Sequence, residues 1–148
     1  MKREQESIGK WISIIHRYGK VYFEKELKPY NIGSGQIIFL MMLLKKDGIS
    51  QEFMAEHLKI DKGTTARAIK KLEKEGYVIR KVDPEDKRAY KVYTTEKAVS
   101  IKPKIKKILS GFTEILEDSF TEEEKELLLK LLKKMAENAA MKIKGKED

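Results

Sequence analysis

The chain has 148 residues, the length of one ordinary domain, and contains no cysteine. It carries 32 Lys and Arg against 24 Asp and Glu, a formal net charge of +8, and 41% of its residues are hydrophobic. This balance excludes a disordered chain, and the lack of cysteine excludes disulfides, thiol redox sensing, cysteine nucleophiles and thiolate metal sites. The basic excess favours a polyanionic partner.

Nothing in the sequence predicts a membrane protein. The longest continuous apolar run, Ile37–Leu44, has eight residues, whereas a spanning helix needs about 20. The N-terminal segment places charges where a signal peptide needs its apolar run. We therefore expect a soluble, cytoplasmic protein.

Two helices are predicted first. Apolar residues recur at three- and four-residue steps from about Ser7 to Leu27, which is typical of an amphipathic helix. The segment Gln36–Leu44 is apolar nearly all round, which predicts a buried central helix.

Two short helices separated by a turn follow. Ser50 is placed to cap the first, in which Phe53 and Met54 are expected to be buried. Asp61 is placed to cap the second, which Gly76 ends. The inward-facing positions of this second helix are Thr65, Ile69 and Leu72. Together these signals predict a helix–turn–helix.

The pattern then changes to that of a β-hairpin. Extended runs at 77–79 and 89–93 flank the turn sequence Asp83–Asp86. The chain is helical again from Thr95, and a capping box at Thr121–Glu124 begins the last helix. The fold class is therefore mainly α with a small β-hairpin wing. The flanking helices are apolar enough on one face to need each other or a second copy of the chain.

Catalytic motifs are missing from the sequence. It has no Gly-rich phosphate loop, no G-x-S-x-G and no H-E-x-x-H, and its two histidines, His16 and His57, lie far apart. We expect no enzyme activity, no metal site and no cofactor.

Two neighbouring segments are basic. The helix after Asp61 has small residues near its start, which allow close approach to base edges in a major groove, and basic residues further along that suit phosphates. The residues on its exposed face are Lys62, Thr64, Ala66, Arg67, Lys70, Lys71 and Lys74. The hairpin adds Arg80, Lys81, Lys87, Arg88 and Lys91, which suit an adjacent minor groove. The alternative is that both segments are simply charged, solvated surface.

Four segments closely resemble the MarR family of winged-helix transcriptional regulators, named for multiple antibiotic resistance. They are Ile49–Glu52, Asp61–Arg67, Leu72–Tyr77 and Asp83–Arg88. The most specific part is the D-x-x-D-x-R pattern of the wing, followed by Val92-Tyr93-Thr94. The resemblance covers the full order of elements, including both terminal dimerisation helices.

The resemblance implies a DNA-binding surface and two departures from the family. At the position of Glu85 the family often has Arg, so the minor-groove contact should fall to Lys87 or Arg88. At about Lys97 the family often has glycine. The predicted DNA-binding residues are Ser50, Gln51, Lys62, Thr64, Thr65, Ala66, Arg67, Lys70, Lys71, Asp83, Asp86, Lys87 and Arg88.

An effector site is implied less directly. In similar regulators, small aromatic acids or other lipophilic ligands bind between the dimerisation helices and the winged domain. The candidate ligand-binding residues here are Trp11, His16, Arg17 and Ser34. The alternative places Trp11 in a dimer core and leaves Arg17 as a surface charge. A zinc-sensing variant would need a histidine cluster that the sequence lacks.

The sequence therefore predicts one winged-helix regulator over residues 1–148. Its winged helix–turn–helix is expected at 34–95, with dimerisation helices at 1–30 and 96–148. The predicted function is that of a homodimeric, sequence-specific DNA-binding transcriptional regulator, a repressor released by a small ligand, on a pseudo-palindromic operator. The alternative is a winged-helix protein–protein or architectural DNA-binding module without its own operator.

Overall fold

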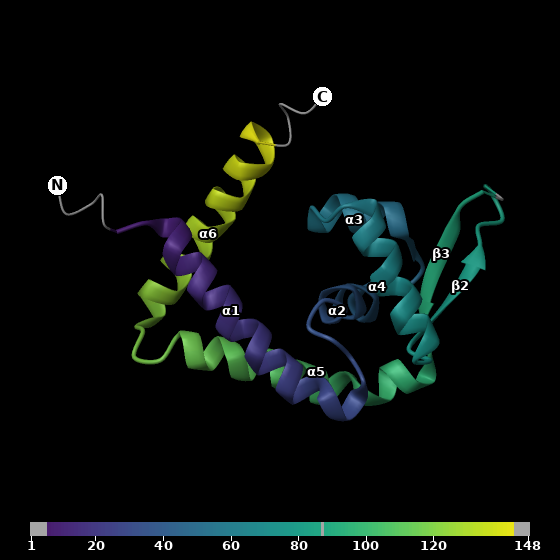
Figure 1. Cartoon of the computed structure of the whole chain (residues 1–148), viewed down its shortest axis with the longest axis horizontal. Helices are drawn as coiled ribbons and strands as arrows, with labels where there is room; N and C mark the ends of the chain where they lie inside the picture. The colour runs from purple at the N-terminus through teal and green to yellow at the C-terminus, as the bar shows by residue number, and fades with distance from the viewer. Residues whose placement is uncertain (1–5, 87, 144–148) are drawn as a thin grey trace. The chain divides into compact units, whose positions relative to one another are not determined.

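The computed structural model describes residues 6–86 and 88–143. The chain forms two compact units, Met1–Phe112 and Thr113–Asp148. The elements, shown in Figure 1, are α1 (Ile8–Leu27), the short 3-10 helix η2 (Lys28–Tyr30), α2 (Ile37–Lys45), β1 (Ile49–Ser50), α3 (Gln51–Leu58), α4 (Lys62–Lys74), β2 (Val78–Val82), β3 (Tyr90–Thr94), α5 (Glu96–Leu116) and α6 (Glu122–Lys142).

The core of the first unit lies around α2. Four side chains of this helix are buried, namely Ile37, Phe39, Leu40 and Leu43. They pack with buried residues from α1, α3, α4, the strands and α5 in one apolar cluster. The prediction of a buried central helix is confirmed, although the side chain of Ile38 is exposed.

The helix–turn–helix is confirmed as α3 and α4. The hydroxyl oxygen of Ser50 accepts a hydrogen bond from the Phe53 backbone N–H at 3.1 Å, as an N-cap should. Met54 is buried as predicted. The prediction for Phe53 is wrong, because its side chain is 48% exposed and stacks on His57 with ring centroids 5.8 Å apart. Phe53 thus faces outward and Met54 inward.

The strands form a three-stranded antiparallel sheet in the order β1–β3–β2. The hairpin of β2 and β3 is confirmed, but the sequence did not predict β1, which is only two residues long. Gly48 precedes β1 with φ +70°, and a Cβ atom there would lie 2.8 Å from the Tyr93 ring. A left-handed backbone beside an aromatic ring requires glycine, so this position fixes how β1 enters the sheet.

Helix α1 packs on the part of α5 that belongs to the same unit. The Tyr22 hydroxyl donates a hydrogen bond to the carbonyl oxygen of Ile108 at 2.8 Å. The Phe112 ring lies 5.3 Å from the Tyr22 ring and 5.1 Å from the Phe23 ring, centroid to centroid. A Cβ atom at Gly19 would lie 3.1 Å from Phe112, so the small residue permits this close approach.

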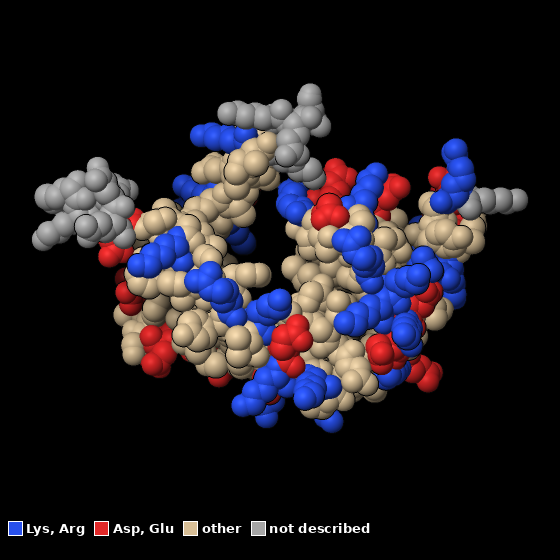
Figure 2. Space-filling model, in the orientation of Figure 1, with Lys and Arg blue, Asp and Glu red and all other residues tan. Residues whose placement is uncertain are grey.

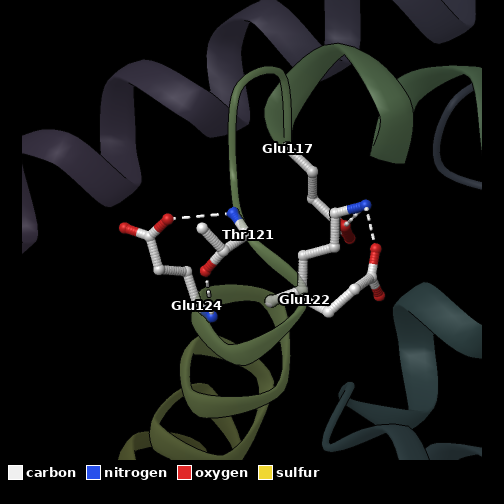
Figure 3. A network of polar contacts seen from close by, with 5 residues as sticks. Glu117, Thr121, Glu122 and Glu124 are labelled. Carbon is white, nitrogen blue, oxygen red and sulfur yellow. Dashed lines mark hydrogen bonds and ion pairs between the residues drawn. The ribbon is translucent and has the colours of Figure 1, made fainter.

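The second unit begins its helix α6 with the predicted capping box (Figure 3). The Thr121 hydroxyl oxygen accepts from the Glu124 backbone N–H at 3.1 Å, and the Glu124 carboxylate accepts from the Thr121 N–H at 2.9 Å. The Lys125 ammonium donates to Glu122 at 3.1 Å and lies 3.8 Å from the Glu117 carboxylate. The hydrogen bond to Glu122 is the main reason that the pKa of Lys125 lies above its ordinary value.

Candidate nucleic-acid interface

The start of α4 is organised by a chain of polar side chains. The Asp61 carboxylate accepts from the Thr64 backbone N–H at 2.8 Å and from the Thr64 hydroxyl at 2.7 Å. These two bonds, the hydroxyl bond first, hold the pKa of Asp61 below its ordinary value. The Arg67 guanidinium in turn donates to the Thr64 hydroxyl oxygen at 3.2 Å. The cap therefore also restrains the guanidinium on the exposed side of the helix.

The two faces of α4 differ as the spacing predicted. Its buried residues are Thr65, Ala68, Ile69 and Leu72. Its exposed residues include Lys62, Thr64, Ala66, Arg67, Lys70 and Lys71. Figure 2 shows Lys and Arg side chains on the helices of this region and on the hairpin beside them.

One predicted DNA-binding residue of α4 needs correction. Thr65 is fully buried, and its hydroxyl donates to the Asp61 carbonyl oxygen at 2.9 Å. A side chain with no exposed surface cannot contact DNA without rearrangement of the helix. Thr65 therefore belongs to the core and to the cap, whereas its neighbours Thr64 and Ala66 face outward.

The predicted residues of α3 lie at its N-terminus. Ser50 and Gln51 are half-buried, and the Ser50 oxygen is used as the cap of the helix. The Ser50 hydroxyl hydrogen is not needed for this cap, so it can still be donated to a phosphate.

The wing is shaped by its two aspartates. The Asp83 carboxylate accepts from the Glu85 backbone N–H at 2.9 Å, and the Asp86 carboxylate accepts from the Arg88 N–H at 3.1 Å. Both contacts are typical of side chains that stabilise a tight turn. The Arg88 guanidinium lies 3.6 Å from the Asp86 carboxylate, and its side chain is 95% exposed. Lys87, the other predicted wing contact, lies outside the described residues.

An ion pair that the sequence analysis missed joins α4 to the wing. The Arg80 guanidinium donates twice to the Glu73 carboxylate, from Nε at 3.2 Å and from Nη2 at 3.1 Å. The sequence predicts Arg80 only as one of the basic residues of the hairpin. The two residues are seven apart and lie on a helix and a strand, so no periodic pattern brings them together. The one available signal was an acidic residue in the last turn of a helix followed by a basic residue early in a strand.

The predicted ligand residues do not form one site. Arg17 lines an open groove with Lys20, Glu24 and Lys71, whereas Trp11 and His16 are not part of its lining. Trp11 instead donates its indole N–H to Glu6 at 3.0 Å.

Ser34 does not line this groove itself but binds Glu24, which does. Its backbone N–H and hydroxyl both donate to the Glu24 carboxylate, at 3.1 and 2.6 Å. These bonds, the hydroxyl bond first, lower the pKa of Glu24.

Other kinds of site are not supported by the described part of the chain. Within residues 6–86 and 88–143, no three His, Cys, Asp or Glu side chains gather as a candidate metal site. None of the helices built from those residues is long and apolar enough to cross a membrane.

Comparison with known proteins agrees with this geometry. The MarR family model matches residues 33–90, which hold α2, β1, α3, α4, β2 and the wing turn as far as the first residue of β3. The HTH-type transcriptional regulator YybA of Bacillus subtilis is 36% identical over 113 residues, 76% of this chain and 75% of the relative. The chain belongs to the MarR family. The resemblance of the four sequence segments to this family is therefore confirmed.

Solved structures of MarR proteins share the fold. A MarR transcriptional regulator from Methanosarcina mazei is 51% identical, with a TM-score of 0.83 over 89% of this chain and 95% of that one. A MarR family protein from Listeria monocytogenes, crystallised in complex with a 26-mer DNA, is 35% identical, with a TM-score of 0.86 over 91% and 90% of the two chains. This chain is accordingly a DNA-binding transcriptional regulator of the MarR type and not an enzyme.

Proposed function

We propose that this MarR regulator binds a pseudo-palindromic operator as a homodimer and acts as a repressor that a small ligand releases. The observation that carries the DNA-binding part is the exposed face of α4, on which the Asp61–Thr64 cap restrains Arg67. In the proposed complex Thr64, Ala66 and Arg67 meet base edges in the major groove.

Other basic residues have different proposed partners. Lys62, Lys70 and Lys71 contact phosphates, and so do Ser50 and Gln51 at the start of α3. Arg88 enters the adjacent minor groove, where a narrow, A·T-rich groove concentrates negative potential. Asp83 and Asp86 support the wing rather than contact DNA, because their carboxylates accept from the turn backbone.

Exposed apolar side chains on the terminal helices support the dimer. On α1, Ile8, Trp11, Ile12, Ile15 and Tyr18 are exposed, and on α6, Leu127, Leu128, Leu129, Leu131 and Leu132 are exposed. Large apolar patches on a soluble protein usually mark an interface, and a two-fold dimer is the commonest way to cover them. A dimer would place its two α4 helices about one DNA turn, roughly 34 Å, apart.

The groove lined by Arg17 supports the effector part of the proposal. Five cationic residues line it, namely Arg17, Lys20, Lys25, Lys28 and Lys71, against Glu24 and Glu75. This excess of positive charge suits the carboxylate of an aromatic acid. Lys71 also lies on the exposed face of α4, so a ligand anion and a DNA phosphate would compete for the same ammonium.

The second candidate is an architectural or protein–protein winged-helix module without its own operator. Its main support is that a basic helix and a basic wing also suit non-specific DNA binding.

A gel shift on the DNA upstream of the protein's own gene, against random DNA of equal length, separates the two functions. The regulator predicts selective binding that falls with salt and that one member of a panel of phenolic acids weakens. Equal affinity for both DNAs would favour the module instead, and a monomer at micromolar concentration in light scattering would refute the dimer.

A further inference from the structure

We propose that Glu73 and Arg80 form a clamp that sets the angle of the wing relative to α4, and so determines whether both reach DNA together. The inference rests on the proposed placement of α4 and Arg88 on DNA. It assigns to this pair a positioning role, not a contact with DNA.

The clamp holds the β2 side of the hairpin near its base, whereas β1 holds the β3 side through the pairs Ile49–Val92 and Ser50–Lys91. Of the β2 residues only Val78 is buried, and on β3 the buried residue is Val92. Arg80 pairs with Val92 across the ladder, so its side chain is on the same face of the hairpin as these two valines. The tip of the β2–β3 hairpin projects away from the neighbouring helices (Figure 1).

The geometry of the pair is directional. Two parallel N–H···O bonds, at 3.2 and 3.1 Å, fix the plane of the guanidinium against the carboxylate, which a single contact would not do. The guanidinium carbon also lies 5.7 Å from the ring centroid of Tyr90, one diagonal neighbour along β3. Arg80 therefore joins three elements, namely the last turn of α4 and both strands of the wing.

The pair is only partly buried, with side-chain exposures of 37% for Arg80 and 34% for Glu73. A surface ion pair of this kind contributes little to the stability of the fold. Its main effect is expected in binding, because a wing held at a fixed angle presents Arg88 to the minor groove at a high effective concentration once α4 is docked. A wing that swings freely would add little to the affinity of α4.

Charge alone makes the opposite prediction for one variant. Glu73→Gln removes a negative charge from the DNA-binding region, so simple electrostatics predicts tighter binding to DNA. The clamp predicts weaker binding to the operator, because Arg80 loses its partner and the wing loses its angle. The sign of this single change separates the two explanations.

The test is a set of double-mutant cycles on full-length protein, with fluorescence anisotropy on the upstream operator fragment. Arg88→Ala is measured in the wild type and in the Arg80→Gln, Glu73→Gln and Lys81→Gln backgrounds. Lys81→Gln is the matched control, since it removes one positive charge from the same strand on the opposite face, where Lys81 lies over Tyr93. Circular dichroism melts confirm that each variant is folded.

The clamp predicts that Arg88→Ala costs about tenfold in affinity in the wild type and in Lys81→Gln, but less than about threefold in the Arg80→Gln and Glu73→Gln backgrounds. Both clamp variants should lose the preference for A·T-rich flanks and keep the base preference that α4 supplies. The exchanged pair, Glu73→Arg with Arg80→Glu, should restore part of the lost coupling.

An equal cost of Arg88→Ala in all backgrounds, or tighter operator binding by Glu73→Gln, would overturn the clamp. An Arg88→Ala variant that binds like the wild type would overturn the clamp too. In that case the wing would contribute no operator affinity that the Glu73–Arg80 pair could control. Arg67→Ala, measured in parallel, reports on the proposed DNA face independently. If Arg67→Ala weakens binding while the coupling is absent, the clamp alone has failed.

Discussion

The ammonium group of Lys97, at the start of α5, donates a hydrogen bond to the carbonyl oxygen of Glu75, the C-cap residue of α4. The two atoms are 2.6 Å apart, and the same nitrogen lies 4.5 Å from the ring centroid of Tyr77. The Tyr77 hydroxyl donates to the carbonyl oxygen of Tyr30. A cation at the C-terminus of a helix satisfies an unpaired carbonyl and complements the helix dipole. Lys97 thus joins the end of α4 to α5.

Replacement of Lys97 should therefore destabilise the protein. Lys97→Met keeps the length of the side chain but removes both the hydrogen bond and the cation–π contact, and we expect a loss of about 1 kcal/mol in the free energy of unfolding. Urea unfolding followed by circular dichroism measures it. Lys104→Met, at an exposed position of the same helix, is the matched control and should change stability by less than about 0.5 kcal/mol. Equal losses of stability in Lys97→Met and Lys104→Met would contradict the role of Lys97 as a cap of α4.

Thr64 and Thr65 are adjacent but should respond differently to the same substitution. Thr65→Val removes the buried hydroxyl that donates to the Asp61 carbonyl oxygen, so it should lower stability by about 1 kcal/mol and leave the operator affinity of the folded protein unchanged. Thr64→Val removes the hydroxyl that holds Arg67, so it should weaken operator binding by about tenfold. Unfolding curves and anisotropy on both variants check this. If Thr65→Val is fully folded and still binds the operator more weakly, Thr65 belongs to the DNA-binding surface after all.

The cap at Asp61 should make part of the stability depend on pH. The pKa of Asp61 lies below its ordinary value of 3.8 in the folded protein, chiefly because the Thr64 hydroxyl donates to the carboxylate. A lowered pKa means that the ionised carboxylate stabilises the folded state above the unfolded pKa, and that this contribution is lost as the pH falls through the folded pKa.

The matching variant is Asp61→Asn, which keeps an acceptor for the cap but does not titrate. As the pH falls below about 5, the free energy of unfolding should therefore decrease less steeply in this variant than in the wild type. Urea titrations at a series of pH values measure both slopes, and parallel curves would exclude Asp61 as a contributor.

The proposed dimer predicts a specific sensitivity of α6. Leu128 is exposed on the apolar side of this helix, and Leu128→Glu should dissociate the dimer because a charge cannot be buried there without a partner. Lys130→Glu changes a charge outside the apolar arc of α6 and should leave the dimer intact. Light scattering over a range of micromolar concentrations measures both. A dimeric Leu128→Glu protein would place the interface elsewhere.

Local signals in the sequence predicted most of the fold. The caps at Ser50, Asp61 and Thr121 and the change of period after Gly76 set the order and type of the elements, because these signals act within a few residues. The two-residue strand β1 escaped prediction because a strand of that length has no period. Phe53 escaped because the direction of a side chain at a helix start depends on how the helix docks.

The sequence predicted which elements and residues form the candidate surface, but not the side-chain contacts between those elements. Spacing on α4 distinguished inward from outward positions, and it already placed Thr65 inward although the predicted surface included it. The periodic pattern of a single element does not predict the partners of Arg80 and Lys97, since each interaction joins two separate elements. Such contacts depend on tertiary packing, which a pattern along one element does not contain.

The central claim is that α4 reads bases through Arg67 and meets phosphates through Lys71. The most direct measurement is the affinity of Arg67→Ala and Lys71→Ala for the upstream operator and for random DNA, each over a range of salt concentrations. We predict that Arg67→Ala loses about 1–3 kcal/mol on the operator and much less on random DNA. Lys71→Ala should weaken both alike and lower the salt slope by about 1. If Arg67→Ala also loses the same affinity on the operator and on random DNA, Arg67 does not read bases. The exposed face of α4 would then be a non-specific basic surface.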